Sequence, residues 1–121
     1  MFHAEVRRDC APWDGDAFSV SISTVADVRK IEPPFIHVSV FQTPNLKRGG
    51  RFAFPDGSRR IGAAFIQPSS GSVVQLRGTV SFTSVILGET VEGQFDLLDA
   101  GSKRYVGRFR ANWMSIRTSC G

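Results

Sequence analysis

Only two histidines, His3 and His37, are available as catalytic bases in this sequence. A nucleophilic triad needs a histidine beside a serine or cysteine, with a third group to orient the imidazole ring. Both histidines fall within alternating strand patterns, on the side that we expect to face outward, and no local spacing suggests a triad. We therefore interpret both as surface residues and assign no catalytic residue.

Acidic residues occur in two groups whose chemistry could include metal binding or proton transfer. Asp14 and Asp16 flank Gly15, but the further oxygen ligands and the final glutamate of an EF-hand loop are absent from the sequence. Glu92 and Asp96 share the outward face of a later hairpin, where solvent-facing carboxylates are ordinary. Phosphate-loop and dinucleotide-binding fingerprints are also missing. We expect a protein that is not an enzyme and that uses no metal and no cofactor.

The two cysteines, Cys10 and Cys120, lie more than a hundred residues apart. No C-x-x-C or H-x-x-x-H spacing accompanies them, so the sequence does not indicate a metal site. Terminal strands are often neighbours in barrels, so one interpretation is a disulfide in an oxidising compartment, and the other is two free thiols. The first residues do not resemble a secretory signal. We expect a cytoplasmic protein if Met1 is the native start, and a periplasmic or secreted one if the cysteines are bridged.

Basic charge is concentrated in two segments of the chain. The 121 residues carry 15 Lys and Arg against 11 Asp and Glu, a formal net charge of +4. Residues 47–60 contain five basic residues and one acidic residue, and residues 103–117 contain five basic residues and no acidic one. Most of these are arginines, whose planar guanidinium group pairs with carboxylates and phosphates. Such clusters indicate an acidic partner, although a solvated face is the other interpretation.

Period-two alternation of apolar and polar residues runs along most of the chain and predicts short strands separated by turns. The clearest strands span residues 74–82, 91–97 and 105–113. Each of the three carries one glycine on its presumed inner face, namely Gly78, Gly93 and Gly107. Glycine within a strand marks a bend or the close approach of another group, so this pattern favours strongly coiled strands.

These elements predict one all-β domain over residues 1–121. The expected architecture is a small antiparallel β-barrel of eight or nine strands, with a β-sandwich as the alternative because both folds bury every second residue. Thr24-Val25-Ala26-Asp27 has the spacing of a capping box and predicts one short helix that ends before Pro33-Pro34. No apolar run approaches the ~20 residues of a membrane-spanning helix. The predicted inner face consists of Phe18, Val20, Ile22, Val38, Val40, Val80, Phe82, Phe95, Phe109 and Trp113.

The composition and motifs favour a function in binding. We expect a protein–protein interaction module with a basic and aromatic surface that contacts an acidic protein. The predicted partner-binding residues are Arg48, Arg51, Phe52, Phe54, Arg59, Arg60, Arg104, Arg108 and Arg110. One alternative is a carrier that holds a small hydrophobic ligand inside the barrel. A second is a single-stranded nucleic-acid binder, which is less favoured because no outward aromatic accompanies the arginines of the last strand.

Overall fold

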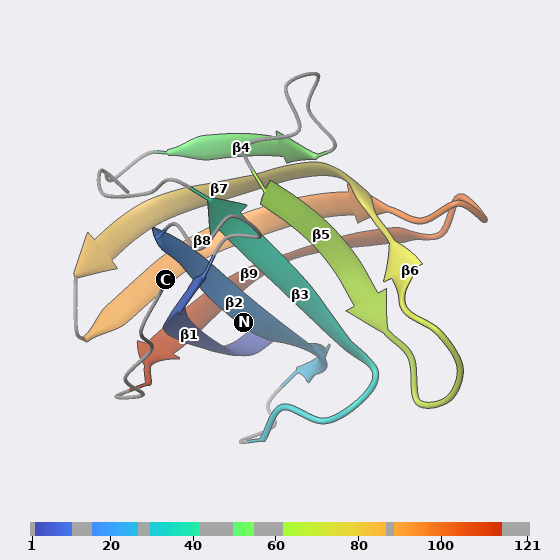
Figure 1. Ribbon diagram of the computed structural model, residues 1–121, viewed down its shortest axis with the longest axis horizontal. Helices are drawn as coiled ribbons and strands as arrows, with labels where there is room; N and C mark the ends of the chain where they lie inside the picture. Colours follow the sequence, from blue (N-terminus) through green and yellow to red (C-terminus); the bar gives the residue numbers. More distant parts are fainter. Residues whose placement is uncertain are drawn as a thin grey trace.

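The structure, a computed structural model, describes residues 2–10, 16–26, 30–41, 50–54, 62–86 and 89–114. Every regular element in this part of the chain is a β-strand (Figure 1). The strands are β1 (Phe2–Cys10), β2 (Asp16–Ala26), β3 (Phe35–Phe41), β4 (Arg51–Phe54), β5 (Gly62–Gln67), β6 (Val74–Gln75), β7 (Arg77–Ile86), β8 (Thr90–Leu98) and β9 (Arg104–Trp113). The expected all-β fold and the expected number of strands are confirmed.

All nine strands belong to one sheet, which curls into a half-barrel (Figure 1). The strand order is β4-β7-β8-β9-β1-β2-β3-β5-β6. Strand β4 forms one edge of the sheet and lies near β5 without pairing with it, so the curl brings the two ends of the sheet towards each other. This arrangement agrees with the barrel-like fold expected from the alternating pattern.

One pairing in the sheet differs from the antiparallel pattern. Strands β1 and β9 are parallel, and their register runs from Phe2 opposite Phe109 to Val6 opposite Trp113. All the other strand pairs are antiparallel. The expectation of a wholly antiparallel barrel is therefore wrong at this position, because turn patterns specify only the pairing of strands that follow one another along the chain.

The helix predicted after Thr24 is absent from the described residues. Strand β2 continues through Thr24 to Ala26, which lies opposite Phe2 of β1. The Thr24 hydroxyl donates a hydrogen bond to the carbonyl oxygen of Pro34 at 2.7 Å instead of capping a helix. Thr24 is β-branched and so favours extended structure, and this preference together with the pairing to β1 outweighs the capping pattern.

The hydrophobic core fills the inner face of the curled sheet. Eight of the ten predicted core residues are buried, and Trp113 packs against the core while remaining half-buried. The side chain of Phe18 lies outside the described part of the structure. Aromatic rings contact one another across the interior, with 6.1 Å between the ring centroids of Phe82 and Phe109 and 6.4 Å between those of Phe95 and Phe109.

The inner-face glycines make room for these rings. Gly93 lies opposite Phe82 on one side and Phe109 on the other, and Gly107 lies opposite Phe95. A Cβ atom at Gly93 would lie 2.8 Å from the Phe109 ring and would overlap the backbone oxygen of Ser81. The close approach that the sequence predicts at these glycines is confirmed, and it lets the sheet coil tightly around large side chains.

Replacing Gly93 with alanine should destabilise the fold. The added methyl group has to displace either the Phe109 ring or the backbone of β7, and overpacking of this kind costs about 1–3 kcal/mol. Chemical denaturation measures the change in unfolding free energy. The matched control is Gln94→Ala, which shortens an exposed side chain on the opposite face of the same strand and should change the free energy by less than about 0.5 kcal/mol. Equal effects of the two substitutions would contradict this account of the glycine.

The parallel pairing of β1 with β9 bears on the two cysteines. The chain leaves both strands at the same end of the sheet, and Cys10 is the last residue of β1. Cys120 lies outside the described residues, seven positions after Trp113, and seven residues of chain span at most roughly 25 Å. We expect protein that is folded under oxidising conditions to show no free thiol after denaturation. Two thiols per chain, counted with a thiol reagent, would exclude the bridge.

Candidate functional site

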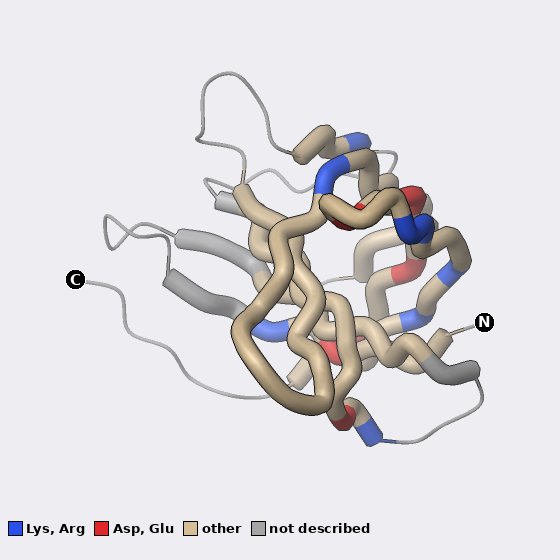
Figure 2. The backbone as a smooth tube through the Cα atoms, turned by 90° about the vertical axis from the view of Figure 1, so that its right-hand side faces the viewer, with Lys and Arg blue, Asp and Glu red and all other residues tan. Residues whose placement is uncertain are grey.

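The outer face of strands β4, β7, β8 and β9 carries a groove lined by arginines. The lining residues that point outward are Arg51, Ala53, Arg77, Thr79, Ser81, Gln94, Asp96, Leu98, Arg104, Val106 and Arg108, and we call this set the outer groove. The groove consists of two parts with volumes of about 740 and 550 Å³, which share Arg51, Thr79 and Asp96. In Figure 2, several of the basic positions gather on one side of the molecule.

Strand register arranges the outer groove in three rows that cross the sheet. The first row is Arg51, Ser81, Gln94 and Arg108; the second is Ala53, Thr79, Asp96 and Val106; the third is Arg77, Leu98 and Arg104. An arginine thus stands at each end of the first and third rows. Three strand spacings, roughly 14 Å, separate the backbones of Arg51 and Arg108. The four arginines frame a centre whose other side chains are neutral except for Asp96.

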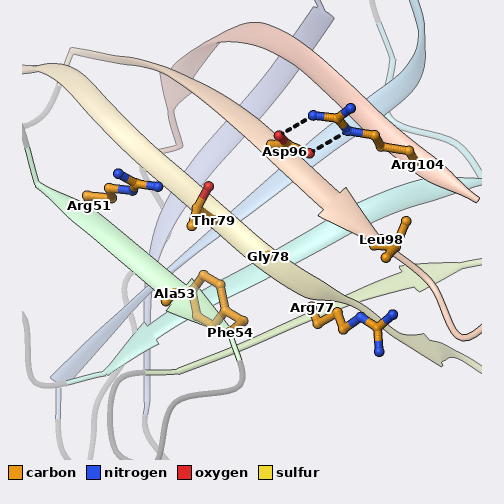
Figure 3. A pocket seen from close by; sticks show the side chains of 9 residues that line it. All are labelled: Arg51, Ala53, Phe54, Arg77, Gly78, Thr79, Asp96, Leu98 and Arg104. Atoms are coloured by element: carbon orange, nitrogen blue, oxygen red, sulfur yellow. Dashed lines mark hydrogen bonds and ion pairs between the residues drawn. The ribbon is translucent and has the colours of Figure 1, made fainter. Parts of the chain in front are cut away.

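The carboxylate of Asp96 is held by Arg104 on the neighbouring strand (Figure 3). The Nε atom of Arg104 donates to Oδ1 of Asp96 at 2.9 Å, and Nη2 donates to Oδ2 at 2.6 Å. The Arg104 side chain is 64% exposed and the Asp96 side chain 48% exposed, so the pair remains in contact with water. Hydrogen bonding to Arg104, and then the charge of the guanidinium group, lower the pKa of Asp96.

A tight turn between β8 and β9 places Arg104 at the start of its strand. Asp99 stabilises this turn, since its Oδ1 atom accepts hydrogen bonds from the backbone N–H groups of Gly101 at 2.8 Å and Lys103 at 2.9 Å. The hydroxyl of Tyr105 donates to Oδ2 of Asp99 at 3.4 Å. Burial, with the negative charge of Asp99 adding to it, raises the pKa of Tyr105. The turn anchors the groove at the end where the third row lies.

The structure brings together three of the predicted binding residues and separates others. Arg51, Arg104 and Arg108 all line the outer groove. Arg110 points to the same side but lies in the next row, opposite Glu92. Three further predicted residues, Arg48, Arg59 and Arg60, lie outside the described residues.

The predicted aromatic residues of the binding surface do not lie on the outer face. Phe54 is only 4% exposed and belongs to the core. The ring of Phe52 packs edge-on against Phe82 with 5.6 Å between centroids, also on the inner side. Strand β4 alternates, so Arg51 and Ala53 face outward while Phe52 and Phe54 face inward. On its outer face, the described part of β4 therefore presents a basic side chain and no aromatic one.

Sequence reasoning missed Arg77 as a groove residue. Alternation in β7 places Arg77 on the same face as Thr79 and Ser81, so its outward direction was available from the pattern. The sequence pattern could not show that Arg77 and Arg51 lie on neighbouring strands, because the pairing of β4 with β7 joins segments that are distant in the sequence. Asp96 was recognised as outward-facing, but its contact with Arg104 is diagonal and depends on the register of the hairpin.

His37 lies on the outer face of a different part of the sheet. Its Nε2 atom is 3.2 Å from the hydroxyl of Ser39 and its Nδ1 atom is 3.4 Å from that of Ser21, while the ring stacks on Phe65 with 4.9 Å between centroids. Within the described ranges, no three His, Cys, Asp or Glu side chains come together closely enough to hold a metal ion. The same ranges contain no helix that is long and apolar enough to cross a membrane.

Comparisons of the chain with protein-family models, with curated proteins and with solved structures find no match.

Replacing Arg104 with glutamine should raise the pKa of Asp96 towards its ordinary value, because the two hydrogen bonds to the ionised carboxylate are weakened. Nuclear magnetic resonance of the side-chain carboxyl carbon during a pH titration measures this pKa. A lowered pKa in the folded state contributes stability above the pKa of the unfolded chain, and this contribution is lost as the pH falls through the folded-state pKa. The stability difference between wild type and Arg104→Gln should accordingly shrink as the pH falls below about 4.

The control for this titration is Arg110→Gln, which removes a charge from the same strand one row beyond the groove. It should leave the pKa of Asp96 close to that of the wild type. A similar rise in both variants would mean that general charge, and not the contact with Arg104, lowers the pKa.

Proposed function

We propose that this protein is a non-enzymatic binding module and that the outer groove binds an acidic segment of another protein. The observation that carries the proposal is the frame of Arg51, Arg77, Arg104 and Arg108, with Asp96 as the one carboxylate among the described residues that line the groove. Four guanidinium groups against one carboxylate give these described residues a net charge of +3. An acidic partner is attracted to such a surface and is oriented as it approaches.

The side chains of the groove suit recognition of protein carboxylates. Guanidinium groups hold carboxylates through two parallel hydrogen bonds, and arginine is enriched at protein interfaces. Between the arginines, Ser81, Gln94 and Thr79 supply hydroxyl and amide groups that can bond to a peptide backbone. Leu98 and Val106, the latter 56% exposed, supply apolar contact area. All these residues stand on strands of one sheet, so little order has to be gained on binding.

The lack of exposed rings among the described residues that line the outer groove favours a protein partner over a single-stranded nucleic acid. Proteins that bind single strands usually stack aromatic side chains on the bases. Of the aromatic residues that line the outer groove, Phe54 and Phe95 are each 4% exposed and belong to the core. A single-stranded nucleic acid bound in this groove would be held by contacts between arginines and phosphates, without the binding energy of base stacking.

The packing of the interior supports a surface site over an internal ligand cavity. Phe82 and Phe109 are fully buried and contact each other edge-on, and Phe95 contacts Phe109 as well as Phe2. A carrier of small hydrophobic ligands would instead keep such side chains apart around an empty space. The inner face therefore suits a structural role, and the outer groove is the better candidate for binding.

Reversing the charge at opposite ends of the first row tests the proposal. The double variant Arg51→Glu/Arg108→Glu should bind a fluorescent peptide that alternates glutamate with serine at least about tenfold more weakly than the wild type. Fluorescence anisotropy measures the binding. Both side chains are exposed, so the thermal midpoint should shift by no more than a few degrees.

The matched control is Arg7→Glu/Lys30→Glu, which makes the same change in net charge at exposed positions outside the groove. It should bind the peptide nearly as well as the wild type does. An equal loss in both double variants would contradict a localised site. Tighter binding of a thymidine oligonucleotide than of the acidic peptide, with the same dependence on Arg51 and Arg108, would favour the nucleic-acid alternative.

A further inference from the structure

We infer that Asp96 is a specificity-determining residue of the outer groove, which competes with the partner by holding Arg104. This inference rests on the proposed function. Asp96 stands in the middle row, between Thr79 and Val106, in the centre of the arginine frame. Its carboxylate makes with Arg104 the same two-bonded contact that a partner carboxylate would make.

The contact runs diagonally across the sheet and does not join residues that lie directly opposite each other. Arg104 lies opposite Leu98, whereas Asp96 lies opposite Val106, so the guanidinium group reaches diagonally back towards the centre of the groove. Figure 3 shows this arrangement, with Arg51 on the far side of Thr79 and making no drawn contact with Asp96. The guanidinium group of Arg104 therefore lies towards the centre of the groove, where the carboxylate of Asp96 neutralises its charge.

The remaining arginines of the frame keep their charge uncompensated within the groove. No ion pair is found for Arg51, Arg77 or Arg108 among the described residues. Carboxylates of a partner are consequently directed to these three positions. An aspartate is ionised throughout the neutral range, and Arg104 lowers the pKa of Asp96 further, so the competition is constant there.

The solvent exposure of Asp96 and Arg104 determines how strongly Asp96 competes with a partner carboxylate. Both side chains are in contact with water, and exposed ion pairs of this kind contribute only modestly to a folded protein. A partner carboxylate can therefore displace Asp96 at a small cost. Removing the Asp96 charge should strengthen binding of an acidic peptide by roughly threefold to tenfold.

A double-mutant cycle tests the inference with the peptide that alternates glutamate with serine as the probe. Asp96→Asn should bind it roughly threefold to tenfold more tightly than the wild type. The control Glu92→Gln removes a charge from the outward face of the same strand, in the row beyond the groove, and should gain less than about twofold. In the Arg104→Gln background, Asp96→Asn should gain less than about twofold, because no guanidinium group is released.

The outcomes distinguish the role of Asp96 from the role of the outer groove as a binding site. An equal gain from Asp96→Asn and Glu92→Gln, or a gain that persists in the Arg104→Gln background, would overturn the role of Asp96 while leaving the groove as the binding site. Failure of both the wild type and Asp96→Asn to bind the acidic peptide better than a lysine–serine peptide of equal length would overturn the proposed function and the inference together.

Discussion

The parallel pairing of β1 with β9 is the interaction on which the rest of the structure depends. It joins two groups of antiparallel strands, β4-β7-β8-β9 and β1-β2-β3-β5-β6, into one sheet. The backbone N–H of Met114 adds a hydrogen bond to the carbonyl oxygen of Val6 at 2.8 Å, beyond the last paired residues. Without this pairing each group would expose a long unpaired strand edge. In the joined sheet, these edges are paired with each other, and the curl encloses the apolar face.

Because successive side chains point to opposite faces of the sheet, the inner and outer faces have different roles. The inward residues of β7, β8 and β9 are rings, aliphatic side chains and glycines that interlock, so these strands are held firmly in place. The outward residues of the same strands carry the arginines and the neutral centre of the outer groove. The outer groove lies on strands whose inner faces form the packed core, so its side chains stand on a rigid backbone. Recognition by a few charged contacts requires this rigidity.

Features with a local cause were predictable from the sequence, and those that depend on distant pairing were not. The burial of Val38, Val80 and Phe109 follows from alternation alone, and so does the outward direction of Arg108. The parallel register of β1 and β9 has no local signal. The helix expected after Thr24 was wrong because a capping pattern of four residues is weaker than a strand pairing with β1. Phe52 and Phe54 were placed on the surface by composition, although the alternation of their own segment assigns them to the core.

The pairing of β1 with β9 also affects folding during synthesis of the chain. Phe2 and Phe109 are partners although more than a hundred residues separate them. During synthesis, β1 can pair with β2 almost at once, but its second edge stays open until β9 has left the ribosome. Contacts between such distant segments form slowly because the intervening loop must first be closed. Until β9 arrives, the open side of β1 is thus an additional unpaired strand edge, of the kind that promotes pairing between chains.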